Sequence, residues 1–293
     1  MKVLNYGSLN YDYIYEVDHM VVEGETISSS NLTASVGGKG LNQSIALAKA
    51  GVEVYHGGTV GEDGEGLLQT CIHNGINTEY IDQCRDRSGH AIIQLDKQAK
   101  NCIILYGGAN QKQSKEHIDE VLGAFGEGDM LLLQNEVNEL PYLIEEASKK
   151  RMKIVLNPSP FDETIQKCDL NQVDYFILNE VEASMMTGEK DSQKALEKMS
   201  ITYPNAKIVL TLGSDGVIYK DKTQTLSQKA YKVDAVDTTA AGDTFTGFFI
   251  GGIVNQMEMK QLLAVCAKAS AITVSRKGAA NTIPTLDEVL SYE

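Results

Sequence analysis

The stretch Asp237–Phe245 combines small residues with carboxylates in a pattern suited to phosphate chemistry. It consists of Asp-Thr-Thr-Ala-Ala-Gly-Asp-Thr-Phe, and the apolar run that follows, residues 245–254, predicts a buried helix. Because Ala240, Ala241 and Gly242 have almost no side chain, their backbone N–H groups can come close to an anion. The positive end of the helix dipole adds to this attraction. The sequence therefore predicts an anion-binding loop where this helix begins.

The carboxylate of Asp243 needs its own explanation, because it would repel a phosphate bound by the same loop. One interpretation is chemical: Asp243 takes a proton from a hydroxyl group while the neighbouring amides hold the phosphoryl group that this hydroxyl attacks. The other is structural, since an aspartate at the start of a helix often caps that helix. The loop alone favours the structural interpretation, and the rest of the chain shifts the balance.

A glycine-rich motif near the N-terminus supplies a second signal. Gly37–Gln43 consists of Gly-Gly-Lys-Gly-Leu-Asn-Gln and leads into a predicted helix at residues 41–50, without the spacing of a Walker phosphate loop. The two motifs lie about two hundred residues apart and resemble the two signatures of the ribokinase family, the PfkB carbohydrate kinases. The resemblance covers nearly the whole chain and implies an ATP-dependent sugar kinase.

Composition limits the alternatives. The 293 residues, 42% apolar and 23% charged, suit a single globular domain over residues 1–293. With 26 basic and 40 acidic residues the net charge is −14, which argues against nucleic acid or an anionic membrane as a partner. The five cysteines are scattered without a CxxC pair, and no signal peptide or membrane-length apolar segment occurs, so we expect a cytoplasmic protein.

Short apolar runs alternate with helical patterns, which predicts an α/β fold whose mostly parallel sheet is covered by helices on both faces. The predicted strands are 3–6, 54–59, 130–133, 153–156, 175–178 and 207–210. The predicted helices are 41–50, 64–74, 115–124, 140–150, 180–187, 192–200, 245–254 and 260–275.

Two stretches, at about 11–36 and 88–107, carry strand-like residues without a helical period. We expect them to form a small separate β-sheet, in which 91–95 and 102–106 pair as a hairpin around the polar turn 96–101. The family resemblance implies that this sheet is a lid over the sugar and that it supports a homodimer.

Polar residues follow several predicted strands at their carboxyl ends, where open α/β sheets bind ligands. They are Asn10 and Asp12, then Gln134, Asn135 and Glu136, then Asn157 and Ser159, then Asn179, Glu180 and Glu182, and finally Thr211, Gly213 and Asp215. Any one of them suits a helix cap or a turn, which is the favoured interpretation of Asn157 and Ser159. Five such sets at one edge indicate a shared crevice.

The resemblance assigns roles within this crevice. The sugar would be bound by Asn10, Asp12, Gly38, Lys39, Asn42 and Glu136, with Asp243 as the base. ATP would contact Asn179, Thr211, Gly213, Gly216 and Gly242. Glu182, in the motif Asn-x-x-Glu, would organise hydrated Mg²⁺, and a monovalent cation such as K⁺ would lie among Asp237, Thr239, Gly278 and Thr282. From the residues alone, turns, helix caps and first-turn glutamates explain many of these positions equally well.

The substrate that the resemblance favours is D-ribose, which ATP would convert to ribose 5-phosphate. Two alternatives stay open: a sibling kinase that acts on fructose, another sugar or a nucleoside, and a non-catalytic protein that binds a sugar or a nucleotide. A dehydrogenase is disfavoured because no GxGxxG follows the first strand.

Overall fold

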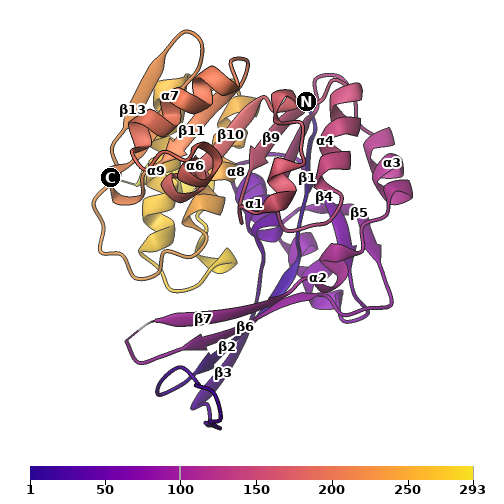
Figure 1. The fold of residues 1–293 in the computed structure, drawn as a ribbon, viewed down its shortest axis with the longest axis vertical. Helices are drawn as coiled ribbons and strands as arrows, with labels where there is room; N and C mark the ends of the chain where they lie inside the picture. The colour runs from indigo at the N-terminus through magenta and orange to yellow at the C-terminus, as the bar shows by residue number, and fades with distance from the viewer. Residues whose placement is uncertain (99, 293) are drawn as a thin grey trace.

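The computed structural model describes residues 1–98 and 100–292, and in these ranges the strands form two sheets (Figure 1). The nine-stranded main sheet has the order β13-β12-β11-β10-β9-β8-β1-β4-β5. Its strands are β1 (Val3–Tyr6), β4 (Val54–Val60), β5 (Asn77–Gln83), β8 (Met130–Gln134), β9 (Lys153–Asn157), β10 (Tyr175–Asn179), β11 (Lys207–Thr211), β12 (Val217–Lys220) and β13 (Thr225–Gln228). All neighbouring strands pair in parallel except β11–β12 and β12–β13.

Helices cover both faces of the main sheet, so the predicted α/β fold is confirmed (Figure 1). They are α1 (Lys39–Lys49), α2 (Glu65–His73), α3 (Lys115–Gly123), α4 (Leu140–Lys149), α5 (Glu163–Gln166), α6 (Glu180–Thr187), α7 (Ser192–Thr202), α8 (Ala241–Val254), α9 (Met259–Val274) and α10 (Leu286–Ser291). All six predicted core strands and all eight predicted helices are present. The sequence does not predict the short helices α5 and α10, the edge strands β5 and β13, or β12, which lies between β13 and β11.

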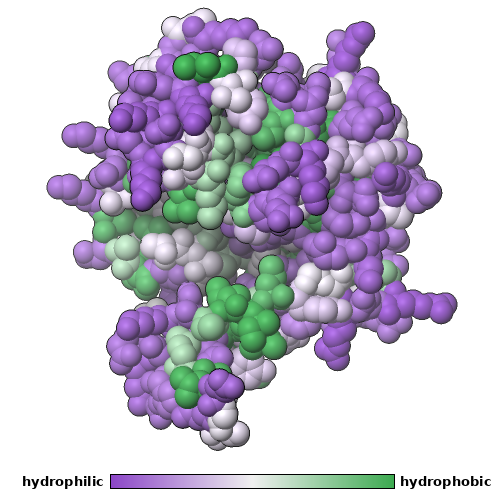
Figure 2. All heavy atoms as spheres, in the orientation of Figure 1, coloured by the Kyte–Doolittle hydropathy of each residue, from purple (hydrophilic) through white to green (hydrophobic). Residues whose placement is uncertain are grey.

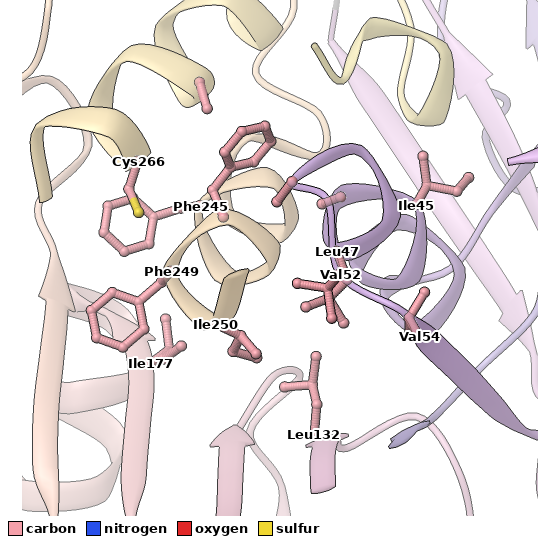
Figure 3. Packing of buried hydrophobic residues seen from close by; sticks show 14 of the residues in the cluster. Ile45, Leu47, Val52, Val54, Leu132, Ile177, Phe245, Phe249, Ile250 and Cys266 are labelled. Atoms are coloured by element: carbon pink, nitrogen blue, oxygen red, sulfur yellow. The ribbon is translucent and has the colours of Figure 1, made fainter. Parts of the chain in front are cut away.

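Alternating strand residues build two separate apolar layers, because neighbouring side chains of a strand point to opposite faces of the sheet. One layer joins the sheet to α1, α8 and α9, and the other joins it to α3, α4, α6 and α7. Figure 3 shows Phe245, Phe249 and Ile250 of α8 within the first layer, between α1 and the strands. Since burial of each such side chain contributes about 1.5–3 kcal/mol, α8 is firmly fixed against α1.

The second sheet projects from the main body at the bottom of Figure 1. Its order is β3-β2-β6-β7, with β2 (Asn10–Glu16), β3 (Asn31–Gly37), β6 (Gly89–Leu95) and β7 (Asn101–Tyr106). The predicted β6–β7 hairpin is confirmed, although Ala99 of its turn lies outside the described residues. Asn10 pairs with Gly37, so the glycine motif and the start of β2 meet where this sheet joins the main body.

Within the described ranges, no helix has both the length and the apolar character that crossing a membrane requires. All five cysteines are free thiols.

Candidate active site

The strand order changes direction at β1, which makes this a topological switch point of the main sheet. After β1 the chain forms the second sheet and then β4 and β5 on one side of β1, whereas β8 lies on the other side. This change of direction separates the loops at the carboxyl ends of β1 and β8, which is where open α/β sheets bind ligands. The loop after β1 contains Ser8, the loop after β8 contains Glu136, and the first turn of α1 lies beside both.

Asp243 lies buried in the first turn of α8, where two side chains of α1 hold its carboxylate. Asn42 donates from Nδ2 to Oδ2 at 3.0 Å, and Gln43 donates from Nε2 to Oδ1 at 2.9 Å. Each oxygen thus accepts one amide hydrogen bond and keeps a lone pair for a further donor. The two motifs that stood two hundred residues apart in sequence meet at this carboxylate.

The start of α8 leaves backbone donors free for an anion. The N–H of Ala241 points to the carbonyl of Thr238 at a long 3.4 Å, whereas the N–H groups of Ala240, Gly242 and Asp243 find no acceptor among the described residues. A Cβ added to Gly242 would meet no atom within 4 Å, so the space beside it is open. Ala240 has a left-handed backbone (φ 60°), which costs an alanine about 1–3 kcal/mol and is typical of functional turns.

The charges of Lys39, Glu136 and Asp243 influence one another. Glu136 accepts hydrogen bonds from the Lys39 N–H (2.9 Å) and from the Ser8 hydroxyl. Burial by itself would lower the pKa of Lys39, but the charges of Asp243, Glu136 and, less strongly, Glu182 raise it. Burial raises the pKa of Glu136 despite the opposing charge of Lys39. Lys39 therefore stays a cation among carboxylates.

Asn10 and Asp12 lie at the start of β2, where the second sheet joins the main body. Asn10 Oδ1 accepts from Asn110 Nδ2 at 2.7 Å, so Asn110, which the sequence did not single out, orients it. The carboxylate of Asp12 packs against Gly37, where any Cβ would collide with it. Burial, followed by the nearby charge of Glu136, raises the pKa of Asp12 to about 6.

Gly38 and Asn42 complete the side of the crevice formed by α1. Gly38 is left-handed (φ 89°) and lies directly before the first residue of α1, a backbone conformation that favours glycine. Asn42 Oδ1 is buried and has no hydrogen-bond partner among the described residues. Since an unpaired buried polar atom costs ~1–3 kcal/mol, a ligand hydroxyl that donates to this oxygen would gain that energy.

Asn179 and Glu182 form a capping box at the start of α6. Glu182 accepts from the backbone N–H (2.9 Å) and from Nδ2 (3.1 Å) of Asn179, and Asn179 Oδ1 accepts from the N–H of Glu182. Both residues therefore cap α6. No three His, Cys, Asp or Glu side chains gather as a metal-binding group within residues 1–98 and 100–292.

The predicted nucleotide residues lie along the next strands of the same edge. Asn179 pairs with Thr211 across β10 and β11, and Gly213 follows in a left-handed turn (φ 54°). Gly216 has a packing reason to be glycine, because a Cβ there would collide with the carbonyl of Gln228. No hydrogen bond joins these residues to the Asp243 cluster in the described part of the chain.

Asp237 meets the loop after α9, as the sequence predicted. It accepts from the backbone and hydroxyl of Thr239 (2.9 and 2.6 Å) and from the N–H of Gly278 (3.2 Å). Burial opposes its charge, but these hydrogen bonds and nearby Lys277 hold the pKa of Asp237 below its usual range. The hydroxyl of Thr282, in contrast, donates to the carbonyl of Ala279 at 2.6 Å rather than to Asp237.

The sequence favoured a helix cap or a turn at Asn157, and its carbonyl does accept from the N–H of Ser159 (2.7 Å), but its side chain has another role. Asn157 ends β9, donates to the carbonyl of Ile177 (2.8 Å) and accepts from Gln43 Nε2 (3.1 Å). It thus belongs to the hydrogen-bond network behind Asp243.

Known proteins resemble this chain over its full length. The model of the family "pfkB family carbohydrate kinase" matches residues 1–286. Ribokinase of Haemophilus influenzae is 32% identical, over 98% of this chain and 96% of that protein. Deoxyribokinase of Salmonella typhi is 28% identical, over 100% and 98%. The structure of Arabidopsis thaliana ribokinase complexed with ribose and ATP superposes with a TM-score of 0.86 at 27% identity, covering 100% of this chain and 99% of that one.

Proposed function

This chain belongs to the pfkB family of carbohydrate kinases, and we propose that it phosphorylates D-ribose with ATP to give ribose 5-phosphate and ADP. The family makes it a phosphotransferase with an alcohol group as acceptor. The observation that best supports catalysis is the Asp243 carboxylate, which two amides orient at a helix start with free N–H groups. A protein that only binds sugar or nucleotide has no need of a buried carboxylate at that point.

In the proposed step, a sugar hydroxyl oxygen forms a bond to the γ-phosphorus of ATP. The bond from that phosphorus to the oxygen bridging to the β-phosphate breaks, and its electron pair leaves with ADP. The hydroxyl proton passes to a carboxylate oxygen of Asp243. The free N–H groups of Gly242 and Asp243 stabilise the charge on the transferring group.

The sugar lies, in this proposal, between the root of the second sheet and the first turn of α1. Asp12 accepts from its hydroxyls, the unpaired Oδ1 of Asn42 accepts another, and Asn10 and Lys39 donate. Ribose is favoured over a nucleoside because the aromatic rings of the second sheet contact one another rather than standing free to stack on a base. The ring centroids of Tyr11 and Tyr13 lie 6.3 Å apart, those of Tyr13 and His90 6.0 Å, and those of His90 and Tyr106 5.0 Å.

A coupled assay of ADP release tests the sugar assignment. It compares kcat/KM for D-ribose, 2-deoxyribose, fructose, adenosine and pseudouridine at fixed ATP. We expect ribose to give the highest value. A higher value for another compound would replace the substrate and leave the roles of Asp243 and the helix start intact.

We propose that the bound ATP carries Mg²⁺, which neutralises charge on the β- and γ-phosphate oxygens. Glu182 can hold it through water, because each carboxylate oxygen accepts only one hydrogen bond from Asn179 and keeps a free lone pair. Glu182→Gln should then raise the Mg²⁺ concentration needed for half-maximal rate much more than the KM for sugar. If the Mg²⁺ titration of the variant overlays that of the wild type while its Tm falls, Glu182 only caps α6.

We also propose that K⁺ activates the enzyme by binding near Asp237, Thr239, Gly278 and Thr282, where oxygen atoms and a negative charge suit a monovalent cation. Replacing K⁺ with a bulky organic cation should lower kcat in the wild type, and Asp237→Ala should abolish that dependence. Asp234→Ala, an exposed neighbour in the same segment, is the matched control and should keep it. Equal wild-type rates with and without K⁺ would contradict the proposal.

The second sheet is proposed to support a homodimer. Figure 2 shows apolar surface over this part of the molecule, and its strands expose Leu32, Ile92, Ile103, Ile104 and Leu105. Exposed apolar patches of this kind mark interaction sites. The mass in solution, measured by light scattering, should be that of two chains and should fall to one chain in Ile104→Lys.

A further inference from the structure

A line of fully buried side-chain amides runs behind Asp243 and is not used by the proposed reaction. Asn5 on β1, Gln134 on β8 and Gln43 on α1 are each 0% exposed. Together they link the centre of the main sheet to the Asp243 carboxylate. An amide has a donor end and an acceptor end, so the direction in which each one points decides what the next one receives.

A backbone carbonyl sets the orientation of the Asn5 side-chain amide. Asn5 Nδ2 donates to the carbonyl of Gly40 (2.7 Å) and to Ser44 Oγ (2.8 Å). Because a backbone carbonyl can only accept, the amide nitrogen of Asn5 must face Gly40. Its oxygen is therefore turned to Gln134 and requires a donor there.

Buried His56 determines the direction in which the Ser44 hydroxyl donates. Ser44 Oγ lies 2.8 Å from His56 Nδ1, and His56 Nε2 lies 3.3 Å from the carbonyl of Gly7. Burial lowers the pKa of His56 to about 4, so the ring is neutral at pH 7. The neutral ring donates from Nε2 to Gly7 and accepts at Nδ1 from the Ser44 hydroxyl, which leaves Ser44 Oγ free to accept from Asn5.

Gln134 sets the orientation of the Gln43 amide. Its Nε2 donates both to Asn5 Oδ1 (2.9 Å) and to Gln43 Oε1 (2.7 Å). Turning the amide over would bring its oxygen against two other oxygens. The orientation is retained although Gln134 Oε1 itself is buried and has no partner among the described residues. Both N–H groups of the Gln134 amide are therefore needed, one for Asn5 Oδ1 and one for Gln43 Oε1.

Gln43 is consequently left with its nitrogen facing Asp243 and Asn157. The amide nitrogen of Asn157 donates to a second backbone carbonyl, that of Ile177, so the amide oxygen of Asn157 must face Gln43. Both ends of the line are anchored on groups that cannot turn over.

We propose that Gln43 is a positioning residue for Asp243 and that Gln134, anchored through Asn5, forces Gln43 to present its N–H to that carboxylate. This inference rests on the proposed role of Asp243 as the base. A reversed Gln43 would place a carbonyl oxygen against the carboxylate, which favours the protonated form and removes the base. The titratable groups that act on Asp243 from neighbouring elements are Lys39 and Glu136, and the test leaves both in place.

Gln134→Glu tests the inference, because a buried carboxyl in its neutral form has only one O–H donor and cannot serve both Asn5 Oδ1 and Gln43 Oε1. Gln43 Oε1 then faces an oxygen or shares the single proton with Asn5, which loosens the amide that holds the Asp243 carboxylate. We expect kcat at pH 7 to fall ~10- to 100-fold, the scale of a misplaced catalytic group. The acid limb of kcat against pH should move upward by about one unit, and the KM for ATP should stay unchanged. Gln134→Met, which introduces no buried charge, should move the limb in the same direction and serves if the glutamate variant does not fold.

Gln113→Glu is the matched control, because Gln113 is also buried and bonded to its neighbours through both ends, but it does not touch the Asp243 network. It should lower the Tm without moving the acid limb. Acid limbs of Gln134→Glu and Gln134→Met that overlay the wild type would overturn the positioning role. If the acid limbs of both Gln134 variants are unmoved while Asp243→Asn is inactive, Asp243 is still the base and only the positioning role of Gln134 and Gln43 is wrong. Wild-type turnover in Asp243→Asn would overturn both.

Discussion

Asp243→Asn should lower kcat by about 10²–10⁴-fold, the usual contribution of general-base catalysis, while nucleotide binding persists. An amide in this position cannot take the proton of the attacking hydroxyl. The free N–H groups at the start of α8 remain, so the phosphates keep their partners. Single-turnover rates together with calorimetric titration of ATP separate the chemical step from binding.

The same substitution has a structural cost that must be measured beside it. The new amide group accepts a hydrogen bond at only one end, so either Asn42 or Gln43 would face another donor. Loss of one such bond costs about 0.5–1.5 kcal/mol, or up to about 3 where the partner was charged, and should lower the Tm without unfolding the protein. The structure already excludes the capping interpretation, because the N-cap of α8 is Ala240 and the Asp243 carboxylate bonds to α1 instead. A well-folded variant with near-wild-type turnover would show that Asp243 only joins α8 to α1.

The sequence was sufficient to predict the main sheet and its flanking helices, because their apolar periods are strong. It also predicted the second sheet, because strand-like residues occur there without a helical period. It did not predict β5 and β13, since these edge strands carry mostly polar residues, nor β12, which has only four residues. It also placed the helix after the anion loop at residue 245, whereas α8 begins at Ala241. Gly242 and Asp243 have low helix propensity, and only the packing of α8 against α1 and α9 brings them into the helix.

The sequence motifs identified the main residues of the site but not the hydrogen-bond network between them. Asp243, Lys39, Asn42 and Gln43 lie in the two motifs and Gln134 was noted at a strand end, but their hydrogen bonds to one another were not predicted and Asn5 was not singled out. Asn5 and Gln134 lie within or at the end of buried strands, where their neighbours in sequence are apolar. Their contact arises from register across β1 and β8 and from the close approach of α1, and a single sequence carries no local signal of either.

Asp12→Ala should raise the KM for ribose about 10- to 100-fold and leave that for ATP nearly unchanged. A charge-assisted hydrogen bond contributes about 1.5–3 kcal/mol, and each 1.4 kcal/mol corresponds to a factor of ten. Because burial and Glu136 raise the pKa of Asp12 to about 6, the wild-type carboxyl loses its charge as pH falls through that value. The KM for ribose should therefore rise below pH 6 in the wild type, and this pH dependence should disappear in the variant.

Asp18→Ala is the control for the Asp12 variant, since Asp18 follows the same strand but is exposed and pairs with Lys97. It should change neither KM. Steady-state assays with ribose and 2-deoxyribose on all three proteins then show which hydroxyl Asp12 contacts. If Asp12 accepts from the 2-hydroxyl, the wild type discriminates against 2-deoxyribose and the variant does not, because a substrate without that hydroxyl leaves the carboxylate unpaired. Equal preference in the wild type and in Asp12→Ala would place the sugar's 2-hydroxyl elsewhere, and an unchanged KM for ribose would remove Asp12 from the site.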